Sequence, residues 1–256
     1  MHNTLTRLGE TRSAQESNHL LLTPDTLVRT TLPGMKACAA IVHAGPALGA
    51  AFTEYTAEFE AGGELGSTAL QRFVYVMEGT IGVESEGRRK GRPQELSARG
   101  YAYFSQGAPH RVKSKNGARV AVIEKPYERL GSVGPPQAIV SSEDAISSQA
   151  LDDDPDLQVK CLLPDEPRFD FAVNTMVYQP GAALSRVEMH VMEHGLIMLE
   201  GGGIYRLGDS WYPVTAGDFI WMAPWCPQWF GAIGKVPAKY LIYKDFHRHP
   251  LAGSER

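Results

Sequence analysis

The stretch Phe52–Gly62, FTEYTAEFEAG, has a counterpart in the second half of the chain, Phe171–Gly181, FAVNTMVYQPG. The two stretches have the same length, and apolar and polar positions alternate in both. Alternation with a period of two predicts a β-strand with one buried face. Because the pattern recurs, we expect an internal structural repeat, which would fix the architecture of the chain.

A second pair of segments follows in the same order. RFVYVMEGTIGV from Arg72 resembles HGLIMLEGGGIYRL from His194. Each segment is an apolar strand that turns at a glycine, Gly79 or Gly201, into another strand. The same hairpin is therefore predicted in both halves.

A third pair completes the repeat. GYAYFSQGAPHRV from Gly100 parallels GDFIWMAPWCPQWF from Gly217, and both strands end in a proline followed by one side chain that could bind a metal, His110 or Gln228. Short strands separated by glycine and proline, with few helical windows, predict an all-β fold. We expect two tandem jelly-roll barrels in one chain.

The boundary between the barrels is predicted from composition. Leu130–Pro155 combines glycines, prolines, serines and acidic residues, which is typical of a linker. The first barrel is therefore expected at residues 1–130, the linker at 131–160 and the second barrel at 161–256.

The composition argues against several classes of protein. With 256 residues, 43% of them hydrophobic and 21% charged, the chain is expected to fold as an ordinary globular protein. Its formal net charge of -4 lacks the basic excess that nucleic-acid binding needs. The one basic run, Arg88–Lys90, is flanked by glycines and is expected to form an exposed hairpin turn.

The cysteines and the N-terminus indicate a cytoplasmic location. Cys38, Cys161 and Cys226 are odd in number, far apart and without a CxxC pair, so we expect neither a disulfide framework nor a zinc site built on thiolates. Residues 1–19 are polar, and no stretch approaches the ~20 apolar residues that a membrane helix needs. No membrane partner is expected.

Glu188, His190, His194 and Gln228 are predicted to bind one divalent metal ion in the second barrel. Glu188 and His190 are two residues apart in a segment with strand character, so their side chains point to the same face. His194 lies four residues further, about 13 Å away in a straight strand, and reaches the same ion only if the chain reverses near Met192. A helix would also bring His190 and His194 together, but the glycines that follow disfavour it.

The chemistry of these four side chains supports a metal site. Two imidazoles, a carboxylate and an amide oxygen bind Mn²⁺, Fe²⁺ or Ni²⁺ without a thiolate. Gln228 has apolar neighbours, where an amide is costly to bury without a partner; a metal is one such partner and a backbone hydrogen bond is the alternative.

The ligands stand among glycine and proline residues at set intervals: Gly181, Glu188, His190, His194, Gly201, Gly217, Pro224 and Gln228. This run resembles the two motifs of the cupin superfamily, with Glu188 at the usual first-histidine place, His194 at the usual glutamate place and Gln228 at the last histidine place. Glu, His, His and Gln in the second barrel of a bicupin resemble the (S)-ureidoglycine aminohydrolase family. The resemblance spans nearly the whole chain.

The resemblance implies a function. It implies hydrolysis of (S)-ureidoglycine to (S)-ureidoglycolate and ammonia in purine (allantoin) catabolism. One Mn²⁺ ion per chain and a homo-oligomer are also implied.

The resemblance further assigns substrate-binding and catalytic residues. Tyr205, Tyr240 and Lys244 match family positions that line the substrate pocket, together with Glu188 and Gln228. Lys244 is expected to pair with the substrate carboxylate, while Glu188 and Gln228 handle protons and orient the substrate. Taken singly, the tyrosines fit ordinary packing and Lys244 fits a surface charge; as a set they favour function.

The first half lacks an equivalent ligand set. Gly66, Thr68 and Arg72 stand where the second half has Glu188, His190 and His194, and only His110 matches a ligand position. We therefore expect the first barrel to bind no metal and to serve structure, assembly or pocket closure.

Two other functions remain open from the sequence. A cupin dioxygenase would use Fe²⁺ in a similar ligand set, and a non-catalytic bicupin would bind a small ligand without turnover. Three further side chains are weaker candidates: His247 and His249 are expected in a solvated tail, and Cys226 as a buried, inert thiol.

Overall fold

A computed structural model describes residues 11–85 and 93–248, which form two compact units. Unit 1 comprises residues 11–27, 149–159 and 175–244, and unit 2 comprises the remaining described residues. The expected hairpin turn at Arg88–Lys90 and the candidate His249 lie outside the described residues.

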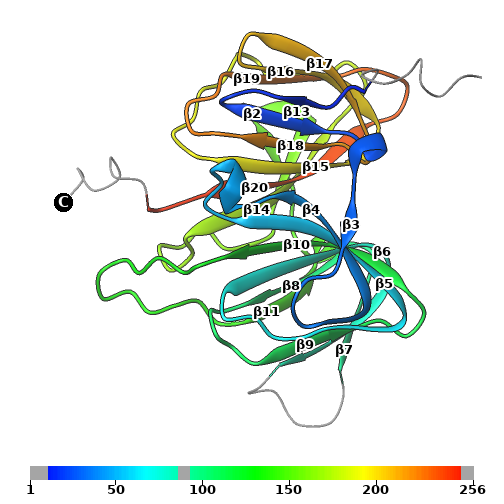
Figure 1. The fold of residues 1–256 in the computed structure, drawn as a ribbon. Coiled ribbons are helices and arrows are strands. Elements are labelled where there is room, and N and C mark those ends of the chain that lie inside the picture. Colours follow the sequence, from blue (N-terminus) through cyan, green and yellow to red (C-terminus); the bar gives the residue numbers. More distant parts are fainter. Residues whose placement is uncertain (1–10, 86–92, 249–256) are drawn as a thin grey trace, which may run out of the picture. The chain divides into compact units, whose positions relative to one another are not determined.

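Unit 2 is built on a nine-stranded sheet. The central order is β11-β8-β6-β10-β5-β4-β3, with β7 and β9 paired to β6 and β9 also to β5 (Figure 1). The strands are β3 (Arg29–Thr30), β4 (Met35–Ala44), β5 (Thr53–Leu65), β6 (Gln71–Ser85), β7 (Gln94–Ser97), β8 (Gly100–Phe104), β9 (His110–Lys113), β10 (Ala118–Lys125) and β11 (Ile139–Ser142).

Unit 1 carries most of an eight-stranded sheet with the order β1-β2-β18-β15-β20-β14-β13-β12, and a three-stranded sheet with the order β17-β16-β19. The strands are β1 (Ala14–Gln15), β2 (His19–Leu22), β12 (Gln149–Leu151), β13 (Asp154–Cys161), β14 (Phe171–Tyr178), β15 (His194–Glu200), β16 (Gly202–Leu207), β17 (Ser210–Thr215), β18 (Phe219–Met222), β19 (Gln228–Ala232) and β20 (Ala238–Asp245).

The two sheets confirm the repeat seen in the sequence. The order β8-β6-β10-β5-β4 in unit 2 matches the order β18-β15-β20-β14-β13 in unit 1. The recurring segments fall on equivalent strands: β5 corresponds to β14, β6 to β15 and β8 to β18. The prediction of an all-β fold is confirmed.

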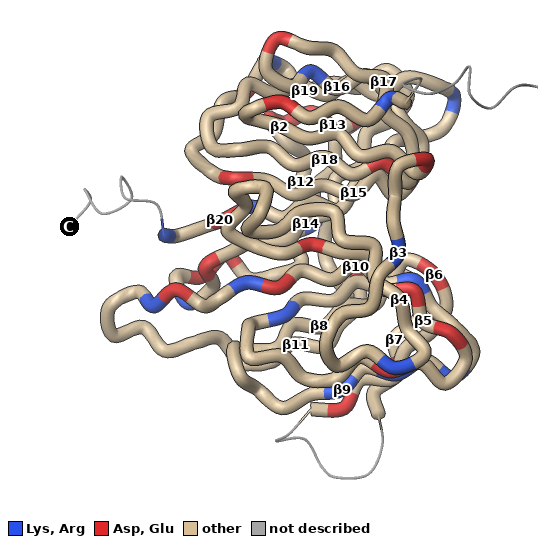
Figure 2. Tube along the Cα trace, viewed as in Figure 1, with Lys and Arg blue, Asp and Glu red and all other residues tan. Residues whose placement is uncertain are grey.

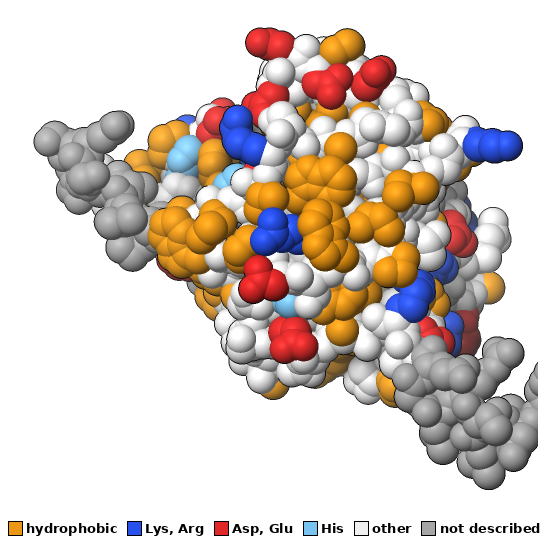
Figure 3. Space-filling view, turned by 90° about the horizontal axis from the view of Figure 1, so that it is seen from above, with side chains coloured by type: hydrophobic (Ala, Val, Ile, Leu, Met, Phe, Trp, Pro, Cys, Tyr) orange, Lys and Arg blue, Asp and Glu red, His pale blue; other side chains and the backbone are white. Residues whose placement is uncertain are grey.

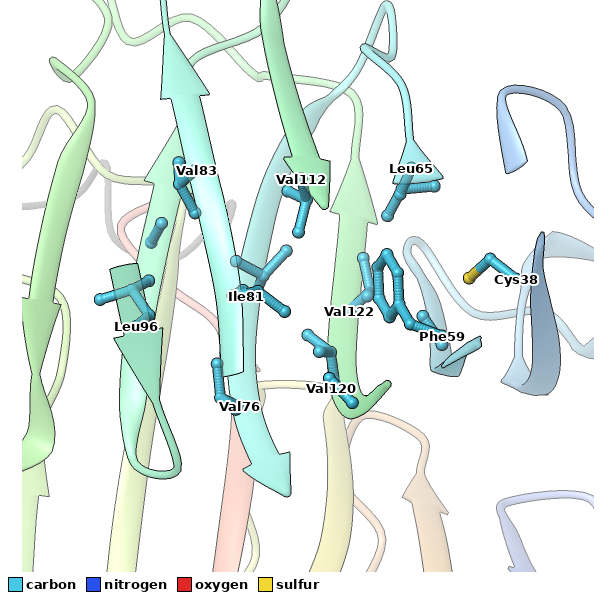
Figure 4. Packing of buried hydrophobic residues seen from close by; sticks show 14 of the residues in the cluster. Cys38, Phe59, Leu65, Val76, Ile81, Val83, Leu96, Val112, Val120 and Val122 are labelled. Carbon is cyan, nitrogen blue, oxygen red and sulfur yellow. The ribbon is translucent and has the colours of Figure 1, made fainter. Parts of the chain in front are cut away.

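Each unit has its own apolar core. In unit 2, alternate residues of β5, β6 and β10, such as Phe59, Val76 and Val120, point to a common interior (Figure 4). In unit 1, Leu196, Phe230 and other buried residues form the equivalent cluster. The period-two alternation of the sequence therefore places one face of each strand in a barrel interior.

The N-terminal segment belongs to unit 1, whereas the sequence predicted residues 1–130 as one barrel. Strand β2 pairs with β18 through Leu21 and Ile220 (Figure 1). The Arg12 guanidinium also donates two hydrogen bonds to the buried Asp218 carboxylate, at 2.7 and 2.9 Å. Residues 131–160, predicted as a linker, hold β11, β12 and most of β13. The two compact units therefore have other boundaries than the two predicted barrels.

The helices among the described residues are three short 3-10 turns, η2 (Pro24–Thr26), η3 (Pro46–Leu48) and η4 (Glu143–Ala145). None of the described helices has the length and apolar character needed to cross a membrane. Lysine and arginine are interspersed with aspartate and glutamate along the trace (Figure 2).

The hairpin glycine Gly201 has a conformation that other residues adopt at a cost. Its φ is 63°, and a Cβ atom there would overlap the backbone of Pro237 and Ala238 at the start of β20. A Cβ atom at Gly79 would likewise overlap the backbone of Gly117 and Ala118 at the start of β10. The repeat therefore depends on glycine at both turns.

Replacing Gly201 by alanine is expected to lower the free energy of unfolding by about 2–4 kcal/mol, because left-handed strain and steric overlap add. Gly181→Ala is the matched control: its φ is 89°, but no atom lies within 4 Å of the added Cβ. Gly181→Ala should lower the free energy of unfolding only by the left-handed backbone strain, about 1–2 kcal/mol. Urea unfolding measures both, and equal losses would contradict the overlap.

Candidate functional site

The four predicted metal ligands lie in unit 1. Glu188 forms an isolated β-bridge with Gln228, the first residue of β19, with N to O distances of 2.8 and 2.9 Å. Val187 and Met189 are 41% and 57% exposed, whereas Glu188 and His190 are half-buried, so the alternation expected for this segment is present. The segment forms this bridge rather than a longer strand.

His190 contacts both neighbouring ligand candidates. Its Nε2 lies 3.0 Å from Oε2 of Glu188, and its ring centroid lies 5.4 Å from that of His194. The chain bends at Val191–Met192, and His194 then begins β15. A bend therefore brings the two histidines together, and the alternative of a helix through these residues is wrong.

The donor set fits a divalent metal ion. Oε2 of Glu188 and Nε2 of His190 lie 3.0 Å apart, and carboxylate oxygen and imidazole nitrogen are donors that would suit such an ion. Burial lowers the pKa of His194 to about 3, and the nearby His190 and Lys244 act in the same direction, so its imidazole is neutral, as a ligand must be.

The structure does not assemble all the ligands. Among the described residues, no three His, Cys, Asp or Glu side chains form a group that could hold a metal ion. The structure thus brings Glu188 and His190 together and sets His194 beside His190. Gln228 is opposed to Glu188 through the backbone.

Tyr205 lies beside Gln228. These residues occupy the paired strands β16 and β19, and the Tyr205 hydroxyl donates to Oε1 of Gln228 at 3.4 Å, a long hydrogen bond. Both side chains are buried, with exposed fractions of 1% and 4%. The Gln228 amide therefore has a side-chain partner, which the sequence alone did not indicate.

Tyr240 belongs to a cluster of buried aromatic rings that also includes Tyr178. The rings of Tyr178, Tyr205 and Tyr240 pack around Phe230, and the hydroxyls of Tyr178 and Tyr240 are 2.7 Å apart. Burial raises the pKa of all three phenols, and the Glu188 carboxylate raises it further. Each phenol is therefore protonated, and the cluster lies close to the Glu188 charge.

Tyr178 was not identified as a site residue from the sequence. It is the last residue of the alternating stretch FAVNTMVY, where the pattern indicates only an inward-facing strand position. Its hydrogen-bond partner lies on β20, distant in sequence, so the pairing required the fold.

Lys244 lies near the histidines. It is the register partner of His194 across β15 and β20, and its charge contributes to the lowered pKa of His194. Lys244 is half-buried and shares a strand face with Tyr240, because the two residues are four apart on β20. An ammonium group therefore lies close to the predicted ligands.

In unit 2, Arg72 occupies the position equivalent to His194. Its guanidinium donates to the Glu124 carboxylate at 2.7 Å, to the Gly66 carbonyl at 2.6 Å and to Nε2 of His110 at 2.8 Å. Thr68 accepts a backbone hydrogen bond from Leu70. A guanidinium thus fills the equivalent place in unit 2, and metal-free function of this barrel stays a prediction.

His110 is held as a neutral ring. Its Nδ1 lies 2.7 Å from the carbonyl oxygen of Ala108, so Nδ1 donates there and Nε2 accepts from Arg72. The ring stacks on Phe104, with centroids 4.0 Å apart. Burial lowers the pKa of His110 to about 4. His110 is therefore a buried, hydrogen-bonded histidine in the core of unit 2.

The surroundings of the weaker candidates, Cys226 and His247, explain both residues without a catalytic role. Cys226 is 3% exposed, and burial raises the pKa of its thiol. His247 contacts the Asp165 carboxylate at 2.9 Å. Cys226 belongs to the buried core of unit 1, and His247 belongs to unit 2.

Comparison with known proteins identifies the family. The model of the cupin domain matches residues 174–243, which include all four predicted ligands. (S)-Ureidoglycine aminohydrolase from Arabidopsis thaliana is 38% identical over 250 residues, covering 95% of this chain and 80% of that protein. The enzyme of the same name from Escherichia coli (strain K12) is 30% identical, covering 91% of this chain and 90% of that protein.

A solved structure supports the same assignment. The crystal structure of the protein Ylba from E. coli matches with a TM-score of 0.82 and 27% identity, covering 95% of this chain and 98% of that chain. Sequence identity and fold agree over nearly the full length. The chain belongs to the (S)-ureidoglycine aminohydrolase family of the cupin superfamily.

Proposed function

We propose that the protein hydrolyses (S)-ureidoglycine to (S)-ureidoglycolate and ammonia in purine catabolism, using one Mn²⁺ ion per chain. The observation that carries this proposal is the contact of His190 with both Glu188 and His194 in a chain 38% identical to a protein of that name. In the reaction a C–N bond breaks, a C–O bond to water forms, and the departing ammonia takes one proton from the water.

Glu188, His190, His194 and Gln228 would hold the ion, and their oxygen and nitrogen donors suit Mn²⁺. When bound, the metal supplies Lewis acidity and lowers the pKa of groups attached to it. The barrel in unit 2, with Arg72 in the equivalent place, would hold no ion.

Other side chains of unit 1 would bind and orient the substrate and transfer protons. The ammonium of Lys244 would pair with the substrate carboxylate, and the hydroxyl of Tyr240 would fix its orientation as a neutral donor. Tyr205, whose hydroxyl donates to Gln228, would line the pocket beside them. Glu188, half-buried beside these phenols, is the group suited to accept and return a proton, while the Gln228 amide orients the substrate.

Product analysis tests this proposal against its rivals. Freshly generated ureidoglycine incubated with Mn²⁺-loaded protein should give one ammonia and one ureidoglycolate per substrate consumed, without uptake of oxygen. Oxygen consumption would support the Fe²⁺-dependent dioxygenase, and binding without turnover would support the non-catalytic ligand binder.

Lys244→Ala is expected to raise the KM for ureidoglycine about 10- to 100-fold, because a charge-assisted hydrogen bond to the carboxylate is lost. Steady-state kinetics measures this effect. Lys235→Ala, at an exposed lysine of the same unit, is the control and should leave the KM unchanged. An unchanged KM in Lys244→Ala would remove Lys244 from the binding site.

A cytoplasmic homo-oligomer forms part of the proposal. Apolar side chains gather on the face seen in Figure 3, interrupted by single charged groups. Trp211 and Trp225 are 56% and 51% exposed, and Trp211 contacts Trp229 with ring centroids 5.6 Å apart. Exposed apolar surface of this kind favours association between protein surfaces.

A further inference from the structure

The paired hydroxyls of Tyr178 and Tyr240 leave a hydrogen-bond donor unused. Both side chains are buried, with exposed fractions of 0% and 2%, and their oxygens are 2.7 Å apart. Two protonated phenols carry two protons, but a single hydrogen bond joins them. Among the described residues neither hydroxyl has another hydrogen-bond partner. One of the two protons therefore has no acceptor within the described part of the chain.

Burial makes this unused donor costly. A buried hydroxyl without an acceptor loses its hydration without compensation. Both rings pack on Phe230, at centroid distances of 4.9 Å for Tyr178 and 5.8 Å for Tyr240. The Glu188 carboxylate lies close enough to act on both phenols, but the hydrogen bond of the pair joins only the two hydroxyls. The missing acceptor is thus expected to come from a bound ligand.

The position of the pair indicates which hydroxyl faces that ligand. Tyr240 lies on β20, on the same strand face as Lys244, whose charge acts on His194. Tyr178 ends β14, on the neighbouring strand. An ammonium and a phenol on one strand face together suit a carboxylate oxygen. The free proton is therefore best placed on Tyr240.

We infer that Tyr178 is a positioning residue: it donates its hydroxyl proton to Tyr240 and so directs the Tyr240 hydroxyl, as a donor, to a carboxylate oxygen of the substrate. This inference rests on the proposed function, because the ligand it names is the carboxylate of ureidoglycine. Tyr178 itself touches no substrate and acts through Tyr240.

Tyr178→Phe tests the inference, because it removes one oxygen and keeps the ring. With ureidoglycine as substrate, its KM should rise about tenfold, the size of one hydrogen bond, while kcat stays within about twofold. Mn²⁺ affinity should not change, because Tyr178 is not a ligand. Tyr75→Phe is the matched control: it removes a buried hydroxyl that donates to Glu143 at 2.6 Å in unit 2, and should leave the KM unaltered.

A double-mutant cycle separates positioning from packing. Tyr240→Phe should raise the KM at least as much as Tyr178→Phe, and adding Tyr178→Phe to it should change the KM by less than about twofold. Additive effects, or an unchanged KM in Tyr178→Phe, would overturn the role of Tyr178. Wild-type protein that releases no ammonia would instead overturn the proposed function itself, so the two failures are distinguishable.

Discussion

Replacing His190 by alanine is expected to abolish tight Mn²⁺ binding and to lower ammonia release from ureidoglycine about 10³-fold. His190 contacts both Glu188 and His194, so its loss removes the central donor of the predicted set. A metal ion that stabilises charge contributes several kcal/mol to a transition state, and each 1.36 kcal/mol is a factor of about ten in rate. Metal analysis after dialysis and single-turnover ammonia release measure the two effects.

His247→Ala is the matched control for this substitution. His247 contacts Asp165 in unit 2, so the variant should keep one Mn²⁺ per chain and wild-type activity. Retention of tightly bound Mn²⁺ and full turnover in His190→Ala would contradict the assigned site.

Removal of the chain up to Leu22 is expected to unfold unit 1 and to abolish activity. Leu20 and Leu21 of β2 are 7% and 0% exposed, and burial of a leucine side chain contributes ~1.5–3 kcal/mol. The deletion also removes Arg12 from the buried Asp218 carboxylate and leaves β18 with β15 as its one remaining neighbour in the sheet of the described residues. These losses are large against a typical total stability of about 5–15 kcal/mol.

Circular dichroism and thermal unfolding of the truncated protein measure this effect. A synthetic peptide of residues 11–27 should restore part of the structure and activity, because β2 pairs with β18 through backbone hydrogen bonds. A truncated protein with wild-type melting temperature and turnover would show that β2 is dispensable.

The repeat was predictable because its signals are local. Alternation in Phe52–Gly62 and Phe171–Gly181 follows from the pleat of a strand, and Gly79 and Gly201 mark turns where a Cβ atom does not fit. The bend before His194 was predictable because four residues of straight strand would separate it from His190 by about 13 Å, too far for a shared ion. These features depend on chain geometry over a few residues.

The features that the sequence did not predict depend on contacts between residues that are distant in sequence. The segment HLLL of β2 has no alternation, and its partner β18 lies about 200 residues later, so its place in unit 1 could not be predicted. Tyr178 shows the same limit, since its pattern predicts only an inward side chain. The extent of the strand before His190 also depended on its partner, because the stretch pairs with β19 through two isolated bridges, Ala183 with Gly231 and Glu188 with Gln228.

The most direct measurement is ammonia release from ureidoglycine by metal-stripped protein, before and after addition of Mn²⁺. The account predicts release at background level without metal and full restoration at one Mn²⁺ per chain. Equal release by folded protein without metal, or no release by folded protein loaded with Mn²⁺, would contradict it.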